Sequence, residues 1–221
     1  MLSTCARRDF SYRSIYRRKR IRKQTIKLKI LSQGLLDARR HSSLSEEIRR
    51  FAYFGSRAPR LGFSSPPEGG FCLSSFVLVM RRRSILLEKA AESDEWEHLT
   101  GMDEERVRML AKEGKWLIPS SHLIFGEHPK DAAKRVFEEQ LCVKRYSLKF
   151  LAVLSGIGET RRYAGRPHLD ICFVYSGKLR GTLKRPDWLS ELTYVDARRL
   201  RPSYFGRDHE GVLEQLGMLS G

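Results

Sequence analysis

The sequence predicts an α/β domain that follows a strongly basic N-terminal extension. Continuous β-rich runs fill residues 71–80 and 84–88 on either side of an arginine-rich turn, a pattern typical of buried strands joined as a hairpin. A helix-forming segment then separates this pair from two further β-rich runs at residues 148–154 and 169–175. The uneven distribution of charge is the third observation, and it separates the extension from the domain.

Four more elements are expected around these strands. Residues 103–112 predict a helix that ends at Gly114, and residues 191–195 predict a last strand followed by a short helix. Residues 208–216 predict a terminal amphipathic helix, which Asp208 should cap. Both strands and helices are thus expected in the second half of the chain, as in an α/β fold.

The net charge of +16 lies mostly at the N-terminus. Through Arg60, 17 Lys and Arg face four acidic residues, whereas the rest of the chain holds 25 basic and 22 acidic residues. We therefore expect a basic extension at 1–62, partly disordered or helical, a Ser-, Pro- and Gly-rich linker at 63–70, and a domain at 71–221. Within the extension, residues 45–54 predict a short helix capped by Ser45.

The cations of the extension are interleaved with Phe10, Tyr12 and Tyr16, and six of them form a dense cluster. The cluster consists of Arg17, Arg18, Lys19, Arg20, Arg22 and Lys23. Such a pattern suits phosphate backbones and unstacked bases, so RNA or a ribonucleoprotein is an expected partner. Three alternatives stay open: an organelle transit peptide, a merely solvated extension, and translated sequence upstream of the true start. A transit peptide would place the protein in mitochondria; otherwise we expect it in the cytoplasm.

No apolar run reaches the roughly 20 residues that a membrane span needs, so no membrane association is expected. Cys72 and Cys172 lie in predicted buried strands and show no paired metal spacing, so they are interpreted as small hydrophobic residues in a reducing compartment. Alternation places His168 and Asp170 on one face of a strand. Without a third ligand, structural hydrogen bonding is the preferred interpretation of that pair.

The segment with the most chemical information begins at Trp116. Pro129 in a first-turn position and Asp131 close behind it predict a helix over about 128–141. One apolar arc of this helix would carry Ala132, Ala133, Val136, Phe137, Gln140 and Leu141. Glu139 would lie at the edge of the arc, four residues after Arg135, which is close enough to orient its carboxylate.

Residues 116–143 resemble a Nudix box. The family pattern is Gly, five residues, Glu, seven residues, and Arg-Glu-apolar-any-Glu-Glu-any-Gly-apolar, introduced by a Trp-x-x-Pro-Gly-Gly turn. The chain keeps Trp116, Pro119, Gly126, Glu127, Pro129, Ala132, Ala133, Arg135, Phe137, Glu139 and Val143. It departs at Ser121 and Cys142, where the family has Gly, and at Val136 and Gln140, where the family has Glu.

The resemblance implies a Nudix-type α/β/α sandwich around a mixed β-sheet. It also implies a site for Mg or Mn, because Glu residues on the family's helix coordinate divalent cations that bridge a diphosphate. Carried over to this chain, the metal ligands are Glu127 and Glu139, with Glu139 catalytic and Arg135 orienting it. Some members place a catalytic glutamate outside the box, which makes Glu159 a candidate; a solvent-exposed loop carboxylate is the alternative.

Two functions remain open at this point. In the first, the fold binds a nucleotide, another diphosphate-containing small molecule or RNA, with weak or no hydrolase activity. In the second, the protein is an active Mg- or Mn-dependent hydrolase of a nucleoside diphosphate derivative. Val136 offers no metal ligand and Gln140 only a neutral carbonyl, which favours the first function. The box and the strand at 168–175 look most like those of archaeal Nudix-like proteins.

Overall fold

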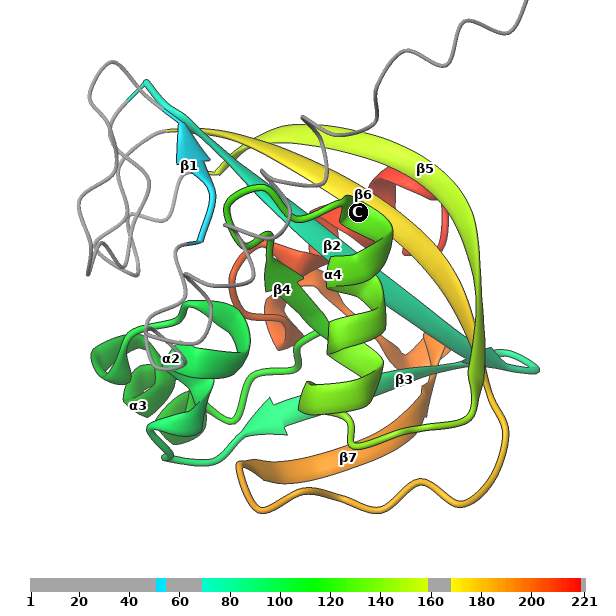
Figure 1. Ribbon diagram of the computed structural model, residues 1–221. Helices are drawn as coiled ribbons and strands as arrows, with labels where there is room; N and C mark the ends of the chain where they lie inside the picture. The colour runs from blue at the N-terminus through cyan, green and yellow to red at the C-terminus, as the bar shows by residue number, and fades with distance from the viewer. Residues whose placement is uncertain (1–50, 55–68, 159–167, 220–221) are drawn as a thin grey trace, which may run out of the picture. The chain divides into compact units, whose positions relative to one another are not determined.

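The computed structural model describes residues 51–54, 69–158 and 168–219. Within these residues, seven strands form a mixed sheet in the order β5-β6-β2-β3-β7, with β1 and β4 also paired to β2 (Figure 1). The strands are β1 (Tyr53–Phe54), β2 (Phe71–Arg81), β3 (Ser84–Ala90), β4 (Ser120–His122), β5 (Tyr146–Gly158), β6 (His168–Leu179) and β7 (Leu189–Asp196). The predicted α/β fold is therefore confirmed.

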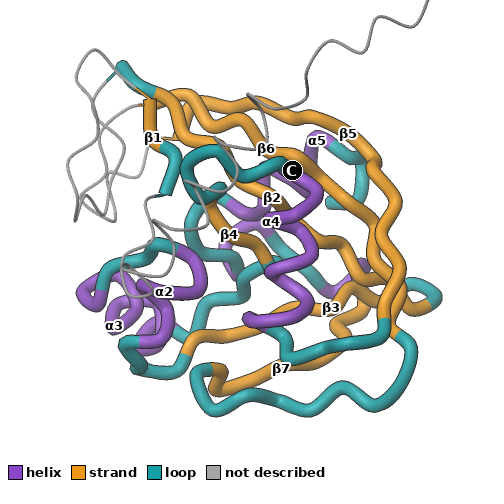
Figure 2. Tube along the Cα trace, viewed as in Figure 1, coloured by secondary structure: helices purple, strands orange, loops and turns teal. Residues whose placement is uncertain are grey.

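The helices are short and lie around the sheet (Figure 2). They are α2 (Glu95–Thr100), α3 (Glu104–Glu113), α4 (Pro129–Arg135), the π-helical turn η1 (Val136–Gln140), the 3-10 turns η3 (Ala197–Arg199) and η4 (Pro202–Tyr204), and α5 (His209–Gln215). No helix among the described residues is long and apolar enough to cross a membrane.

Strand β2 lies in the middle of the sheet, and each of its two faces packs into a different hydrophobic core cluster. It runs parallel to β6 and antiparallel to β3, which follows it through a tight turn. Val77 and Val79 pack with residues of α4 and η1, including Phe137. Phe76 and Leu78 lie in a separate core cluster on the other face, together with Val212 and Leu213 of α5. The sheet is thus covered by α4 on one face and α5 on the other, as in an α/β/α sandwich.

The predicted helix over residues 103–112 is confirmed as α3. The Asp103 side chain accepts a hydrogen bond from the backbone N–H of Arg106 at 2.9 Å, and Gly114 ends the helix in the left-handed region. The terminal helix is also present as α5, but its cap was predicted wrongly. Asp208 occupies the N-cap position with φ of 54°, and its side chain makes no capping hydrogen bond.

The helix expected over residues 45–54 is wrong at its C-terminal end. Tyr53 and Phe54 are extended and pair antiparallel with the start of β2. Ala52 is buried, and its backbone N–H donates to the carbonyl of Leu123 at 2.6 Å. Strand pairing and burial therefore override the local helix pattern here, and the folded domain includes residues ahead of the expected boundary at 71. Residues 45–50 lie outside the described residues.

Candidate functional site

The box folds as a strand, a loop and a helix that widens at its end. Strand β4 pairs with β2, and α4 begins at Pro129 after His128, whose ring Nδ1 accepts from the N–H of Lys130 at 3.1 Å. The helix then passes into the π-helical turn η1, in which the N–H of Leu141 bonds to the carbonyl of Val136 at 3.0 Å. The predicted helix over about 128–141 is therefore confirmed, with a π-helical last turn.

Arg135 is a buried brace that holds the box together. Its Nε and one Nη bind both carboxylate oxygens of Glu127, at 3.0 and 2.9 Å. Its remaining N–H groups bind the carbonyl of Leu99 at 2.9 Å, the hydroxyl of Ser121 at 2.9 Å and the carbonyl of His122 at 2.8 Å. All five guanidinium donors are used, so Arg135 connects α2, β4, the loop and α4.

This arrangement differs from the role expected for Arg135. The guanidinium fork orients Glu127 and not Glu139, although Glu139 is only one helical turn away in sequence. Glu127 is fully engaged, because its second oxygen also accepts the backbone N–H of Ile124 at 2.8 Å. Both oxygens of this expected metal ligand are therefore held by protein donors in the described structure.

The two replaced carboxylate positions point into the interior. Val136 is 1% exposed and packs with Val77, Val79 and Leu86 of the sheet. Gln140 is also 1% exposed, and its amide donates to the Glu88 carboxyl on β3 at 2.5 Å. The indole of Trp188 covers this turn and donates to the backbone carbonyl of Gln140 at 3.0 Å. These side chains fill the space beside the helix with packed groups.

Glu88 is a buried ionisable residue next to the box helix, and the sequence pattern did not indicate it. It is 1% exposed, and burial raises the pKa of its carboxyl to about 8, although the hydrogen bond from Gln140 acts in the opposite direction. Glu88 Oε2 and Gln140 Oε1 are buried without a hydrogen-bond partner. A proton on Glu88 turns one of these acceptors into a donor, so a neutral carboxyl suits the pair.

Glu139 lies at the edge of the helix, as its spacing from Arg135 predicts. It is half-buried, whereas its neighbour Glu138 is exposed and accepts a hydrogen bond from the Tyr146 hydroxyl. Glu138 thus faces solvent. Glu159 and the cationic cluster from Arg17 to Lys23 lie outside the described residues.

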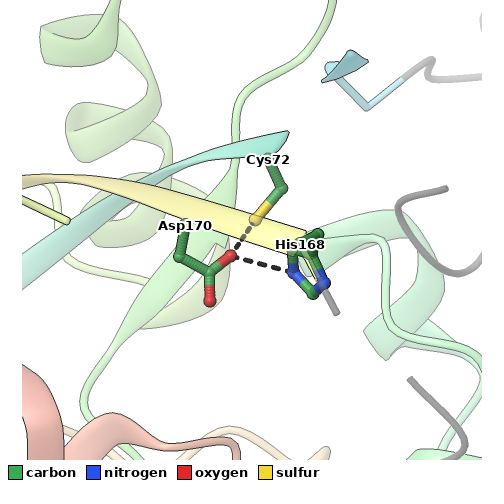
Figure 3. A group of neighbouring side chains, drawn as sticks. All are labelled: Cys72, His168 and Asp170. Carbon is green, nitrogen blue, oxygen red and sulfur yellow. Dashed lines mark hydrogen bonds and ion pairs between the residues drawn. The ribbon is translucent and has the colours of Figure 1, made fainter. Parts of the chain in front are cut away.

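A second cluster lies on the sheet face opposite α4. His168 Nε2 lies 3.0 Å from Asp170 Oδ1, as the expected structural hydrogen bond requires. The Cys72 thiol of β2 donates to the same oxygen, so a third potential ligand joins the pair (Figure 3). Cys72 and Cys172 are buried, as expected. Sequence spacing could not find this third residue, because Cys72 and Asp170 are 98 positions apart.

The described domain is similar to solved Nudix proteins. A MutT Nudix hydrolase from Burkholderia pseudomallei is 20% identical, with 66% of this chain and 98% of that chain covered and a TM-score of 0.43. A UDP-X diphosphatase is 13% identical, with coverage of 86% and 74% and a TM-score of 0.44. The Nudix domain of NrtR from Shewanella oneidensis, in complex with ADP-ribose, is 12% identical, with coverage of 73% and 92% and a TM-score of 0.43. No family model matches the sequence, and no curated protein matches it.

The donor set of this Nudix-like box does not fit a multi-metal centre. Magnesium and manganese need several oxygen ligands in a near-octahedral array. Glu127 is committed to Arg135, Val136 has no donor atom, and the Gln140 amide is bound to Glu88. Glu139, half-buried at the edge of the helix, is the other carboxylate at a metal-ligand position of the box. One carboxylate together with substrate phosphates is the most that this helix offers to a hard cation.

Proposed function

We propose that this chain is a Nudix-fold binding protein for a nucleotide, another diphosphate-containing small molecule or RNA, with weak or no diphosphate hydrolase activity. The observation that carries the proposal is the hydrogen bond from Gln140 to Glu88 inside the domain. A box position that would present a metal ligand to a substrate instead satisfies a buried carboxyl. Val136 has the same consequence, because it extends the apolar face of the helix.

The hydrogen bonds of Arg135 support a structural role for Glu127 and Arg135, two box residues that match the family pattern. A bidentate Arg–carboxylate pair with side chains 7% and 14% exposed fixes the loop against the helix. Such a brace keeps the fold intact whether or not a metal binds. The match to the Nudix pattern at Glu127 and Arg135 is therefore compatible with a protein that binds and does not hydrolyse.

The ligand side of the proposal rests on charge. The extension holds 17 basic residues through Arg60 and only four acidic ones. Cations at this density bind phosphates mainly through the release of counterions, so the binding is salt-dependent. We propose that this extension contacts RNA or nucleotide phosphates in the cytoplasm; if the N-terminus is instead a transit peptide, the protein acts in mitochondria and the extension has no such role.

The first experiment tests turnover in the full-length protein. The protein is incubated with a panel of nucleoside diphosphate derivatives, including ADP-ribose and UDP-sugars, with Mg²⁺ or Mn²⁺, and released phosphate products are measured. We expect no turnover above the background of the matched variants. Glu139→Gln removes the remaining box carboxylate, and Glu138→Gln is the control, because Glu138 is exposed on the adjacent position. Turnover that Glu139→Gln abolishes and Glu138→Gln preserves would establish the active hydrolase instead.

The second experiment tests binding. Affinity for single-stranded RNA and for the same nucleotides is measured at several salt concentrations, with the cationic cluster intact or changed to Gln at all six positions. The changed positions are Arg17, Arg18, Lys19, Arg20, Arg22 and Lys23. The salt dependence of log K for RNA should fall in magnitude by up to about four units. An unchanged salt dependence would remove the extension from the binding surface.

A further inference from the structure

A polar cavity of about 60 Å³ lies on the sheet face that α5 covers, away from the Nudix-like helix. Strands β2, β4 and β6 contribute its floor, and Arg207 and His209 reach it from the C-terminal segment. The side chains that line it are of unusual chemistry for a protein interior, with two thiols, three imidazoles and one carboxylate among them. This cavity takes no part in the function proposed above.

Three of these groups converge on one point. The Cys72 thiol and His168 Nε2 both bind Asp170 Oδ1, and one ligand atom from each residue lies within 4.8 Å of the other two (Figure 3). Cys72 is 2% exposed and His168 is 8% exposed, while the Asp170 side chain is 31% exposed. The cluster is thus closed on the protein side and opens toward the cavity and solvent through Asp170.

The backbone holds this cluster in place. Strands β2 and β6 are parallel neighbours, and Cys72 is the register partner of Asp170. His168 lies two residues before Asp170, so its side chain projects from the same face of β6. The three ligands therefore come from two hydrogen-bonded strands, which is a more rigid support than a loop.

We propose that Cys72, His168 and Asp170 form a three-ligand site for Zn²⁺ or a chemically similar transition metal, with water from the cavity as the fourth ligand. Thiolate, imidazole and carboxylate are the protein ligands of zinc, and three of them with one open position is a recurring zinc geometry. Zinc bonds of ordinary length at tetrahedral angles place the ligand atoms about 3.4–3.6 Å apart. His168 Nε2 and Asp170 Oδ1 are already 3.0 Å apart, so a small opening of the cluster admits the ion.

Metal entry replaces protons that now hold the cluster together. The thiol hydrogen bonded to Asp170 leaves as a proton, and sulfur then gives its electron pair to the metal. His168 binds through the Nε2 lone pair, so the hydrogen shared with Asp170 also moves, either to solvent or to the other ring nitrogen. A divalent ion with one thiolate and one carboxylate is neutral as a group.

A cysteine nucleophile is the competing interpretation of the same three residues, and the geometry opposes it. A nucleophilic thiol needs the imidazole as its direct base, but here the carboxylate of Asp170 lies between the thiol and His168. Burial raises the pKa of the Cys72 thiol well above its usual range, and the charge of Asp170 raises it further. A divalent ion overcomes this by binding the thiolate directly, whereas an organic substrate does not.

The three ligands lie outside the box segment and differ from it in chemistry, although Ser120, Ser121 and His122 of that segment line the same cavity. A soft thiolate selects zinc or cobalt over the hard ions that the Nudix pattern implies. Among the described residues, no other three His, Cys, Asp or Glu side chains cluster this closely. Failure of nucleotide or RNA binding would therefore leave the metal site untouched, and the reverse also holds.

The test uses the full-length protein, stripped of metal by a chelator and titrated with Co²⁺ and then Zn²⁺. We expect one equivalent to bind, with the absorption bands of tetrahedral cobalt and a cobalt–thiolate charge-transfer band that zinc removes. Cys72→Ser should abolish the charge-transfer band, and Asp170→Asn should weaken Co²⁺ binding about tenfold or more. Cys142→Ser is the matched control, because that cysteine is exposed and should not affect the titration.

Two further measurements keep the result decisive if Cys72→Ser does not fold. Metal content of the wild-type protein after zinc loading and gel filtration should be one equivalent by elemental analysis, and magnesium should not compete. Affinity should also fall as pH is lowered, because protons compete for all three ligands. Wild-type protein that retains no zinc, or a charge-transfer band lost in Cys142→Ser and kept in Cys72→Ser, would overturn the proposal.

Discussion

Replacement of Glu88 by Gln should make this protein more stable at neutral pH. Glu88 is buried on β3 and accepts a hydrogen bond from the side-chain amide of Gln140. The second carboxylate oxygen of Glu88 and the side-chain carbonyl oxygen of Gln140 lack partners. Glutamine has the shape of glutamate, keeps the acceptor and adds an amide donor that can face the Gln140 carbonyl. The substitution therefore removes an ionisable group and keeps, at every pH, the donor that only a protonated Glu88 supplies.

The magnitude follows from the pKa of Glu88. Burial raises it from 4.5 to about 8, so the folded state keeps its proton in a pH range where the unfolded state loses it. The folded state then binds more protons, and stability falls as pH rises from about 4.5 to about 8. At about 1.4 kcal/mol for each pH unit, the penalty is about 3 kcal/mol at pH 7 and vanishes below pH 4.5. Glu88→Gln should recover about this amount.

Urea unfolding of the wild type and the variant at pH 5, 7 and 8 measures the difference directly. The variant should gain little at pH 5 and progressively more toward pH 8, and Glu138→Gln, an exposed carboxylate on the adjacent helix, should show no such trend. Subtracting the wild-type free energy of unfolding from that of the variant at each pH cancels the contributions of other titrating groups, such as His122. Burial lowers the pKa of His122 to about 3, so this residue destabilises the fold as pH falls below 6.5. A variant that is less stable than the wild type at pH 8, or a pH-independent difference, would refute a protonated Glu88.

Three further substitutions test the interpretation of the box. Glu127→Gln should lower the free energy of unfolding by about 3 kcal/mol, because it leaves the buried Arg135 charge unpaired. The same variant should bind Mn²⁺ with unchanged affinity in a calorimetric titration. A selective loss of Mn²⁺ binding would restore Glu127 as a metal ligand. Val136→Glu, which recreates the family residue, should destabilise the domain by about 4 kcal/mol and produce no hydrolysis, whereas Val136→Ile should be tolerated. Cys142→Gly should raise the thermal midpoint, since Cys142 has φ of 53° and the left-handed conformation costs a non-glycine residue about 1 kcal/mol; an unchanged or lower midpoint would contradict this.

Local patterns predicted the scaffold well, since each signal acts over a few residues. The continuous β-rich run that begins at Phe71 becomes β2, and Pro129 starts α4 as its fixed φ favours. The same local reasoning failed at Tyr53 and Phe54, where pairing with β2 decided the conformation. It also missed α2, whose N-cap Asp94 makes no capping hydrogen bond and so leaves little local signal.

The chemistry of the site depended on contacts that local patterns do not contain. The partner of Gln140 is 52 residues away on β3, and that of Cys72 is 98 residues away on β6. The Cys72–Asp170 pair is set by strand register and the Gln140–Glu88 pair by the packing of η1 on the sheet, and one sequence without the fold specifies neither. Helical spacing suggested Glu139 as the partner of Arg135. In the structure, the loop instead places Glu127 beside the guanidinium.

The box residues that match the family pattern and those that depart from it are held by different interactions, so the first group can be present without the family residues of the second. Arg135 must keep all five donors satisfied because it is buried, so any loss at Glu127 or Ser121 leaves an unpaired polar group in the interior. Val136 and Gln140 instead adapt to the packed sheet beneath them, one by apolar contact and the other by bonding Glu88. These buried contacts, the Glu127 carboxylate included, stabilise the fold whether or not the box hydrolyses a diphosphate. Glu139, at the edge of the helix, is the position at which the two functional hypotheses diverge.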